Sequence, residues 1–317
     1  MKNKRQLYLK GSGRMNHAGV AELKKTRRLK DADQIWGYVF IAPQIIGILV
    51  FTLIPILFAI ALAFCEWNLL KPPVFVGLTN FQKVFGNKTF WQVLGNTGYY
   101  VLLYVPGVAV VSLTLAMLMN QTFKGVSVLR TLYYLPHLTC SVAVCLVWSF
   151  IYQRDGLLNA ALSVFGIEPQ KWLSDPKLAM PSVVVVCIWR AMGHHMILYL
   201  AGLKGINPTY YEAARIDGAG RFRLFFNITL PLLTPTIFFT LCTSLINSAQ
   251  VFDEIYMLTD GGPGRSTQVM VYQIFSLAFE KMSMGRSAVW ALALFVIIMI
   301  FTAIQFVMQK YWVNYDA

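Results

Sequence analysis

Charged residues are scarce in this chain of 317 residues, and acidic residues are the scarcest of them. Only 13% of the residues are Asp, Glu, Lys or Arg, whereas 57% are hydrophobic and the mean hydropathy is +0.57. A soluble domain of this length could not bury so large an apolar fraction in one core. The composition therefore excludes a soluble protein and indicates a chain solvated mostly by lipid.

Cysteines are also few, and sequence signatures of catalysis are missing. The five cysteines are odd in number, form no CxxC pair and fall in or beside apolar segments, so we expect them to be small packing residues. The GxxxxGK[ST], HExxH and GxSxG motifs do not occur. We therefore expect neither a metal nor a cofactor on this chain, and no catalytic residue. Any ATP that drives the protein would be hydrolysed by another chain.

Six apolar segments are long enough to cross the roughly 30 Å hydrocarbon core of a bilayer as helices of about 20 residues. The first is longer than one span needs, so we expect it to tilt or to continue past the interface. The sequence predicts an all-α, polytopic membrane domain over residues 35–312, after a tail of residues 1–34. The segments lie at about residues 35–64, 97–119, 129–152, 181–203, 232–251 and 288–309.

Basic residues are distributed unequally between the two sides that these segments define. The tail holds ten of them before residue 31, against the single acid Glu22, and its polar composition predicts disorder. With six spans, 17 of the 27 basic residues lie on the side of the tail. Both termini are therefore expected in the cytoplasm. This charge lies beside spans, where anionic lipid is the usual partner, and no basic surface interleaved with aromatic residues indicates nucleic acid.

The most specific motif lies between the fourth and fifth apolar segments. It reads Glu-Ala-Ala at residues 212–214, glycine at 218, and Ile-Thr-Leu-Pro at 228–231. Glu-Ala-Ala favours helix, Gly218 can adopt positive φ and end that helix, and a second short helix can run to Pro231. The spacing resembles, position for position, the EAA signature of the membrane subunits of ABC importers.

Two outer loops extend the resemblance to carbohydrate permeases of this family. The loop after the third segment reads Asp-Gly-Leu-Leu-Asn at 155–159, and its apolar residues follow helical spacing, which predicts a short surface helix. The loop after the fifth reads Leu-Thr-Asp-Gly-Gly-Pro-Gly at 258–264 and is similar to that of the maltose-permease F type. The chain lacks the extra amino-terminal helices and the large inserted outer domain of maltose-type F subunits.

The resemblance implies a type I ABC importer permease fold and three kinds of partner. These are a second, related permease subunit, two cytoplasmic ATP-binding subunits that hydrolyse ATP, and an extracytoplasmic solute-binding protein. The EAA loop, residues 207–231, would seat on an ATP-binding subunit, with Glu212 as its electrostatic anchor and small residues permitting close approach. The expected coupling residues are Glu212, Ala213, Ala214, Asp217 and Gly218.

A pathway for sugars needs amides, hydroxyls and aromatic faces on otherwise apolar helices. The end of the fifth segment offers Ser244, Asn247 and Gln250, and the spacing of Ser244 and Asn247 places them on one helical face. Hydrogen bonding between helices is the alternative role for such residues.

Arg190 lies within the fourth segment, on one face with His194. A charge at the bilayer centre costs at least about 2.5 kcal/mol, so Arg190 is expected to face protein, water or headgroups. It either pairs with an acid such as Asp253 or Glu254 or lines the pathway. A metal site from the adjacent His194 and His195 is disfavoured, because neighbouring residues diverge by about 100° around a helix. The candidate pathway residues are Asn247, Gln250, Ser244, Arg190 and Tyr133, the last with helix kinking and interfacial anchoring as its alternative.

The sequence thus predicts a permease subunit of a sugar importer in the cytoplasmic membrane of a prokaryote, and not an enzyme. An ABC permease for another solute, such as glycerol phosphate, is the first alternative. An ATP-independent carrier is the second, although a carboxylate inside a span would then be expected. A membrane enzyme using Arg190, His194 and Asp253 is the third.

Overall fold

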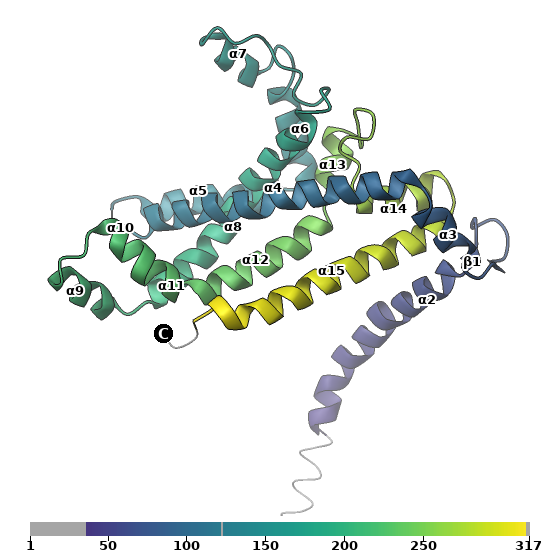
Figure 1. Ribbon diagram of the computed structural model, residues 1–317, viewed down its shortest axis with the longest axis horizontal. Helices are drawn as coiled ribbons and strands as arrows, with labels where there is room; N and C mark the ends of the chain where they lie inside the picture. Colours follow the sequence, from purple (N-terminus) through teal and green to yellow (C-terminus); the bar gives the residue numbers. More distant parts are fainter. Residues whose placement is uncertain (1–35, 122, 315–317) are drawn as a thin grey trace, which may run out of the picture. The chain divides into compact units, whose positions relative to one another are not determined.

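The computed structural model describes residues 36–121 and 123–314 (Figure 1). The chain divides after Ala59 into two compact units, each described here by itself. The tail expected at 1–34 lies outside the described residues. Helices dominate the described part of the chain, and its one sheet is the antiparallel pair β1 (Cys65–Glu66) and β2 (Val74–Phe75).

The first unit is helical from Trp36 onward, and its helix runs through Trp36–Ala63. A π-helical turn, η1 (Leu49–Leu53), precedes the last part, α2 (Ile54–Ala63). No charged residue interrupts these 28 residues. At 1.5 Å per residue the helix is about 42 Å long, which exceeds the hydrocarbon thickness as the sequence predicted.

The second unit contains the remaining elements. In chain order they are α3 (Thr79–Phe85), α4 (Lys88–Met119), α5 (Val126–Leu138), α6 (Ser141–Ile151), α7 (Leu157–Ser163), α8 (Ala179–Gly205), α9 (Pro208–Ile216), α10 (Arg221–Leu224), η2 (Phe225–Thr229), α11 (Leu230–Leu232), α12 (Thr234–Ala249), α13 (Asp253–Leu258), α14 (Met270–Phe275), η3 (Ser276–Glu280) and α15 (Met284–Trp312).

Four of the six predicted spans are continuous helices, and two are bent pairs. The predicted span over 129–152 is a bent pair in the structure, in which α5 and α6 meet at 99°. Helix α5 continues through Pro136 to Leu138, and the helical path breaks at Thr139 and Cys140, which are both extended. The predicted fifth span, 232–251, corresponds to α12, and a bend of 66° separates it from Arg221–Leu232, which contains the second helix of the predicted EAA loop. The described residues therefore provide six spans if each bent pair counts as one.

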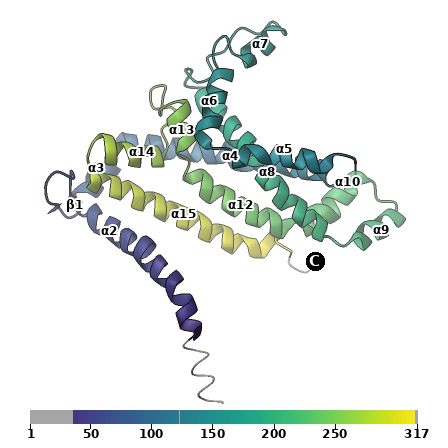
Figure 2. The same ribbon diagram turned by 180° about the vertical axis from the view of Figure 1, so that it is seen from behind.

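Helix α8 packs against α4, α5 and α12 (Figures 1 and 2). Glycine permits these approaches, since a Cβ at Gly193 would collide with the Tyr133 carbonyl of α5 and one at Gly202 with the Thr236 side chain of α12. On the α4 side, Gly107 makes room for the Ile188 side chain of α8. Neighbouring helices therefore hold α8 on three sides.

Two loops that the sequence singled out adopt their expected local structure. Helix α7 is the short helix predicted after residue 155, and the loop behind it is organised by the buried amide of Asn159. That amide donates to three carbonyls and accepts from the Gln170 backbone and the Trp172 indole at 3.0 Å each. In the Gly-Gly-Pro-Gly turn, Gly261 and Gly264 have positive φ, which explains the glycine requirement.

Within the second unit, α9 and α10 lie at the opposite end of the long helices from α3 and α14 (Figures 1 and 2). Helices α4, α12 and α15 run between these ends, and α6 and α13 project from the side of the same bundle. A motif in α9 is thus separated by the length of the spans from the loops around α14.

Candidate functional site

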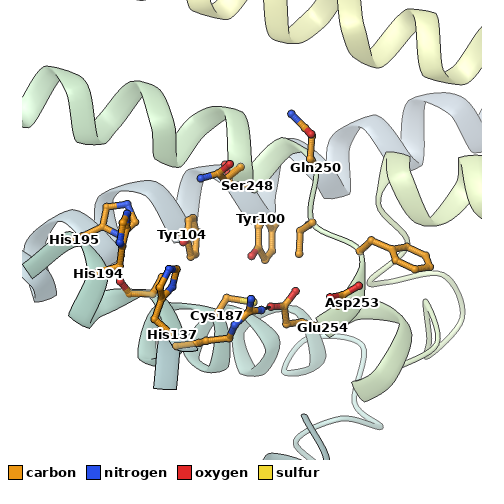
Figure 3. Close-up of a pocket in the computed structure, with 15 residues that line it drawn as sticks. Tyr100, Tyr104, His137, Cys187, His194, His195, Ser248, Gln250, Asp253 and Glu254 are labelled. Atoms are coloured by element: carbon orange, nitrogen blue, oxygen red, sulfur yellow. Dashed lines mark hydrogen bonds and ion pairs between the residues drawn. The ribbon is translucent and has the colours of Figure 1, made fainter. Parts of the chain in front are cut away.

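A cavity of about 470 Å³ lies among α4, α5, α8 and the junction of α12 with α13 (Figure 3). Its walls are unusually polar for helices of this composition. Besides apolar atoms they present hydroxyls, imidazoles, amides, a guanidinium and two carboxylates. The polar lining consists of Tyr100, Tyr104, His137, Arg190, His194, His195, Asn247, Ser248, Gln250, Asp253 and Glu254.

Two pairs of stacked rings form part of the cavity wall. Tyr100 and Tyr104 are four residues apart on α4, so their rings share a face and stack at 5.6 Å with an interplanar angle of 9°. His137 of α5 stacks on His194 of α8 at 4.6 Å and 18°. The cavity therefore offers flat aromatic faces as well as hydrogen-bonding groups.

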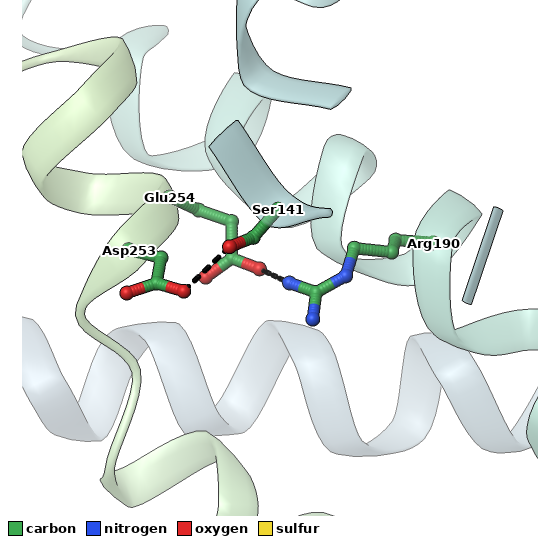
Figure 4. Close-up of polar contacts among 4 residues, drawn as sticks. All are labelled: Ser141, Arg190, Asp253 and Glu254. Atoms are coloured by element: carbon green, nitrogen blue, oxygen red, sulfur yellow. Dashed lines mark hydrogen bonds and ion pairs between the residues drawn. The ribbon is translucent and has the colours of Figure 1, made fainter. Parts of the chain in front are cut away.

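An ion pair joins α8 to α13 beside these rings (Figure 4). Arg190 Nη1 donates to Glu254 Oε1, and this is the one Lys/Arg–Asp/Glu pair within the described residues. The next carboxylate, Asp253, accepts a hydrogen bond of 2.6 Å from the Ser141 hydroxyl at the start of α6. The predicted pairing of Arg190 with an acid of this segment is confirmed, and the pair also lines the cavity.

The polar side chains at the end of α12 have two different locations, the cavity and the interface between helices. Asn247 and Gln250 line the cavity, whereas Ser244 does not. The Ser244 hydroxyl is buried 2.8 Å from His195 Nε2, and His195 Nδ1 lies 3.1 Å from the Ala191 carbonyl. Because a carbonyl only accepts, Nδ1 carries the proton and Nε2 accepts from Ser244. Both nitrogens of His195 are thus engaged within the protein.

The structure places Tyr133 away from the cavity, in an apolar cluster with Met196, Tyr199 and Leu200. Eight of the eleven polar lining residues were not among the candidate pathway residues, and no role was expected for three of them, Tyr100, Tyr104 and His137. The i, i+4 repeat of tyrosine inside an apolar segment was the available signal for the first two. For His137, the available signal in the sequence was its position directly after Pro136.

The EAA segment, residues 207–231, forms two short helices through local contacts. Asn207 caps α9 by accepting from Thr209 N at 3.0 Å, and Pro208 occupies the first turn. The end of α9 closes as predicted on Gly218, whose φ is +79°. Its N–H donates to the Arg215 carbonyl at 3.0 Å, and Ala219 N donates to the Ala214 carbonyl at 2.9 Å, which is a Schellman motif.

This segment leaves both charged and apolar side chains exposed. Glu212, Ala213 and Asp217 are exposed, and so are the large apolar residues Ile216 (86%) and Phe222 (83%). Exposed large apolar side chains gathered beside charges are typical of a surface that binds another protein.

Comparison with known proteins decides the family. The family model described as "Binding-protein-dependent transport system inner membrane component" matches residues 85–311. The chain belongs to this family. The predicted all-α fold of an ABC importer permease is thereby confirmed, and the known members of this permease family are transporter components.

Individual members of the permease family match almost end to end. The probable ABC transporter permease protein YesP of Bacillus subtilis is 38% identical over 96% of this chain and 99% of its own length. The lactose transport system permease protein LacF of Rhizobium radiobacter is 35% identical over 88% and 95%, respectively. A chain of the bacterial alginate ABC transporter, solved with an alginate pentasaccharide-bound periplasmic protein, superposes with a TM-score of 0.77 at 26% identity, covering 89% of this chain and 96% of that one.

Proposed function

We propose that this permease is a membrane-spanning subunit of an ATP-driven importer of carbohydrates and forms half of its translocation pathway. Relatives named for lactose, starch degradation products and trehalose/maltose support this cargo class, as does the alginate transporter. The single observation that carries the proposal is the cavity, which places amides, hydroxyls and stacked rings inside a permease fold.

The chemistry of the cavity suits a polyhydroxylated solute. The amides of Asn247 and Gln250 can donate to and accept from hydroxyls, and the ring faces of Tyr100 and His137 can pack on the C–H faces of a sugar. A volume of about 470 Å³ falls in the range of roughly 300–1,000 Å³ found for small-molecule sites.

The pairing of charges favours sugars over the alternative of a glycerol phosphate. A phosphate needs a cation that is free to bind it, and Arg190 is the one Lys or Arg that lines the cavity. Its guanidinium is bound to Glu254, and Asp253 adds a second negative charge nearby. The residues of the enzyme hypothesis, Arg190, His194 and Asp253, also line the cavity. However, Arg190 is bound to Glu254 and Asp253 to Ser141, and the relatives are transporter components, which favours transport.

Coupling to ATP is proposed to occur through the EAA segment. Glu212, Ala213, Ala214, Asp217 and Gly218 would contact one of two cytoplasmic ATP-binding subunits, which supply the ATP hydrolysis that this chain does not. The exposed Ile216 and Phe222 side chains would be covered in that contact. A second, related permease subunit would complete the pathway, and a solute-binding protein would deliver the sugar from outside.

The proposed orientation places α9 and both termini in the cytoplasm. It rests on the positive-inside distribution of basic residues, of which the ten in the tail lie outside the described residues. Movement of the ATP-binding subunits would then reorient the cavity from one side of the membrane to the other, as alternating access requires.

Transport by the reconstituted complex tests this function. The chain is co-expressed with its partner subunits, placed in liposomes with ATP inside, and supplied with the solute-binding protein and labelled carbohydrates outside. We expect uptake of at least one carbohydrate that stops when either ATP or the binding protein is omitted. Uptake that continues without ATP would contradict the proposal, and so would exclusive uptake of a non-carbohydrate solute.

A further inference from the structure

A second pocket, of about 200 Å³, lies at the end of the long helices opposite α9. It is formed where α3, the start of α4, η3 and the start of α15 meet the loop before α14. Four of its lining residues are basic and none is acidic. We call it the cationic pocket, and its basic residues are Lys83, Arg265, Lys281 and Arg286.

These four positive charges form no ion pair with an acid among the described residues. Arg265 Nη1 donates to the Thr89 hydroxyl at 2.9 Å, and Arg286 Nε donates to the Ser283 hydroxyl at 2.7 Å, so both guanidinium groups are fixed by neutral groups. The side chains of Lys83 and Lys281 make no hydrogen bond or ion pair with the described residues. The carboxylate of Glu280, the nearest acid in sequence, instead accepts from Ser276 at 2.6 Å.

Two further groups in the cationic pocket point to an anion. Gln273 is only 6% exposed and lines the pocket, yet its side-chain amide has no hydrogen-bond partner among the described residues, which leaves N–H donors available. The long helices α4 and α15 both begin here, at Lys88 and Met284, so the positive ends of two helix dipoles add to the charge.

An apolar groove of about 480 Å³ lies farther along α4 and α15. Arg286 and Trp290 of α15 line the cationic pocket, and Leu294, Ile297 and Phe301 of the same helix line the groove. Their spacing of four, four, three and four residues places them on one helical face. From Trp290 to Phe301 the helix rises about 16 Å, close to the roughly 15 Å depth of one leaflet.

We infer that the cationic pocket and the apolar groove together bind one anionic phospholipid. The phosphate of its headgroup would be held by the lysines, arginines and Gln273 amide, and an acyl chain would lie along the groove. An acidic loop of another protein or a free phosphate would use only the pocket, whereas the groove along the same face of α15 requires an apolar extension. Lipid binding does not depend on the proposed cargo, although its assignment to the outer leaflet follows from the proposed orientation.

Lipid binding is tested by native mass spectrometry of the intact complex in neutral detergent. Phosphatidylglycerol and phosphatidylcholine with identical acyl chains are offered at equal concentration. We expect the complex to retain phosphatidylglycerol at least about tenfold more strongly, since each nearby cation adds to the attraction of an anionic headgroup. Equal retention of the two lipids would overturn the inference.

The lysine pair supplies the sharpest variant, because neither side chain holds the fold together. Lys83→Gln with Lys281→Gln is expected to lower retention of phosphatidylglycerol about tenfold and to leave that of phosphatidylcholine unchanged. Lys171→Gln with Lys177→Gln removes two exposed lysines outside both cavities and serves as the matched control. Equal losses in the two double variants would refute a specific site.

The groove is tested separately from the pocket. Ile298→Trp fills the groove, while Val296→Trp adds the same bulk to an exposed position of α15 outside it. Only Ile298→Trp should weaken the retention of phosphatidylglycerol, and neither variant should alter the binding of inorganic phosphate. Displacement of the lipid by millimolar phosphate with no effect of Ile298→Trp would make the site a phosphate site. Loss of solute-binding-protein association in the lysine variant, with lipid retention unchanged, would make it a protein contact.

Discussion

The EAA segment is built by contacts between residues close in sequence, whereas the cavity draws its lining from parts of the chain between Tyr100 and Glu254. In the EAA segment a cap at Asn207 and a turn at Gly218 define both ends of α9. In the cavity, Arg190 meets a partner 64 residues away and Ser141 one 112 residues away. The segment presents exposed side chains, whereas in the cavity Arg190 is paired with Glu254 and Asp253 accepts from Ser141.

This difference predicts different consequences of mutation. A local segment can lose its binding surface and remain inserted with its neighbours intact. A cavity residue such as Arg190 supports helix contacts and lines the cavity at once, so a change there alters stability together with transport. Effects on assembly and on uptake should therefore separate cleanly in the EAA segment and only partly in the cavity.

The prediction with the largest consequence concerns membrane topology. The two regions can have the proposed roles only if α9 lies on the cytoplasmic side, where ATP is bound. Reporter fusions at Lys25 and Arg221 are expected to report a cytoplasmic location, and fusions at Gln170 and Arg265 an external one, since basic residues remain inside. Activity of alkaline phosphatase and fluorescence of a cytoplasmic reporter are the measurements. An external signal at Arg221 would remove the basis for coupling through α9.

Loss of the ATP-binding subunits is the next largest effect. Glu212→Lys combined with Gly218→Val should abolish their co-purification, because it reverses a charge and puts a β-branched residue at φ +79°, which costs about 1–3 kcal/mol. The control is Gly220→Val alone, since Gly220 has an ordinary φ of −74° and open space around it. The control should retain most of the association. Normal co-purification of the first variant would rule out the EAA segment as the docking surface.

Breaking the ion pair should have an intermediate effect on stability. Arg190→Met leaves Glu254, whose side chain is 10% exposed, without a partner, and we expect a loss of about 1–3 kcal/mol because the arginine itself is partly exposed. Thermal unfolding of the purified complex measures this. Adding Glu254→Gln should restore most of the stability, while uptake stays low if these groups contact the sugar. Full uptake by the stable double variant would make the pair purely structural.

Single amides of the cavity should produce the smallest effect. Asn247→Ala or Gln250→Ala is expected to raise the KM for uptake about twofold to tenfold, because each loses a hydrogen bond of about 0.5–1.5 kcal/mol to the sugar. Basal ATP hydrolysis and assembly should be unchanged. Thr243→Ala, on a half-buried position of α12 outside the cavity, is the control. Loss of assembly together with uptake would assign these amides to helix packing.

The same contrast explains what the sequence could predict. Six apolar segments and the turn at Gly218 follow from composition and local propensity, and the structure contains both. The 99° bend between α5 and α6 depends on two extended residues, Thr139 and Cys140, whose side chains do not require that conformation. The apolar composition therefore indicated the span but not the size of the bend within it.

Within the cavity, the sequence predicted the residues with a local signal. Asn247, Gln250 and Arg190 stand out as polar groups in apolar segments, and all three line the cavity. Tyr133 stands out equally but packs in an apolar cluster, since the direction of an aromatic side chain depends on which helix lies beside it. The stacking of His137 on His194 joins two helices and has no counterpart in either local sequence.

The glycine contacts of α8 have a mechanical consequence. At Gly193 the backbone of α8 lies against that of α5, and at Gly202 α8 lies against α12. This close packing opposes sliding of these helices past one another. Helix α8 is continuous to Gly205, and α9 begins at Pro208. A displacement of α9 is therefore transmitted to α8, a continuous helix of about 40 Å that carries Arg190 and His194. We expect α8 to rotate as a rigid body at the cavity rather than to bend.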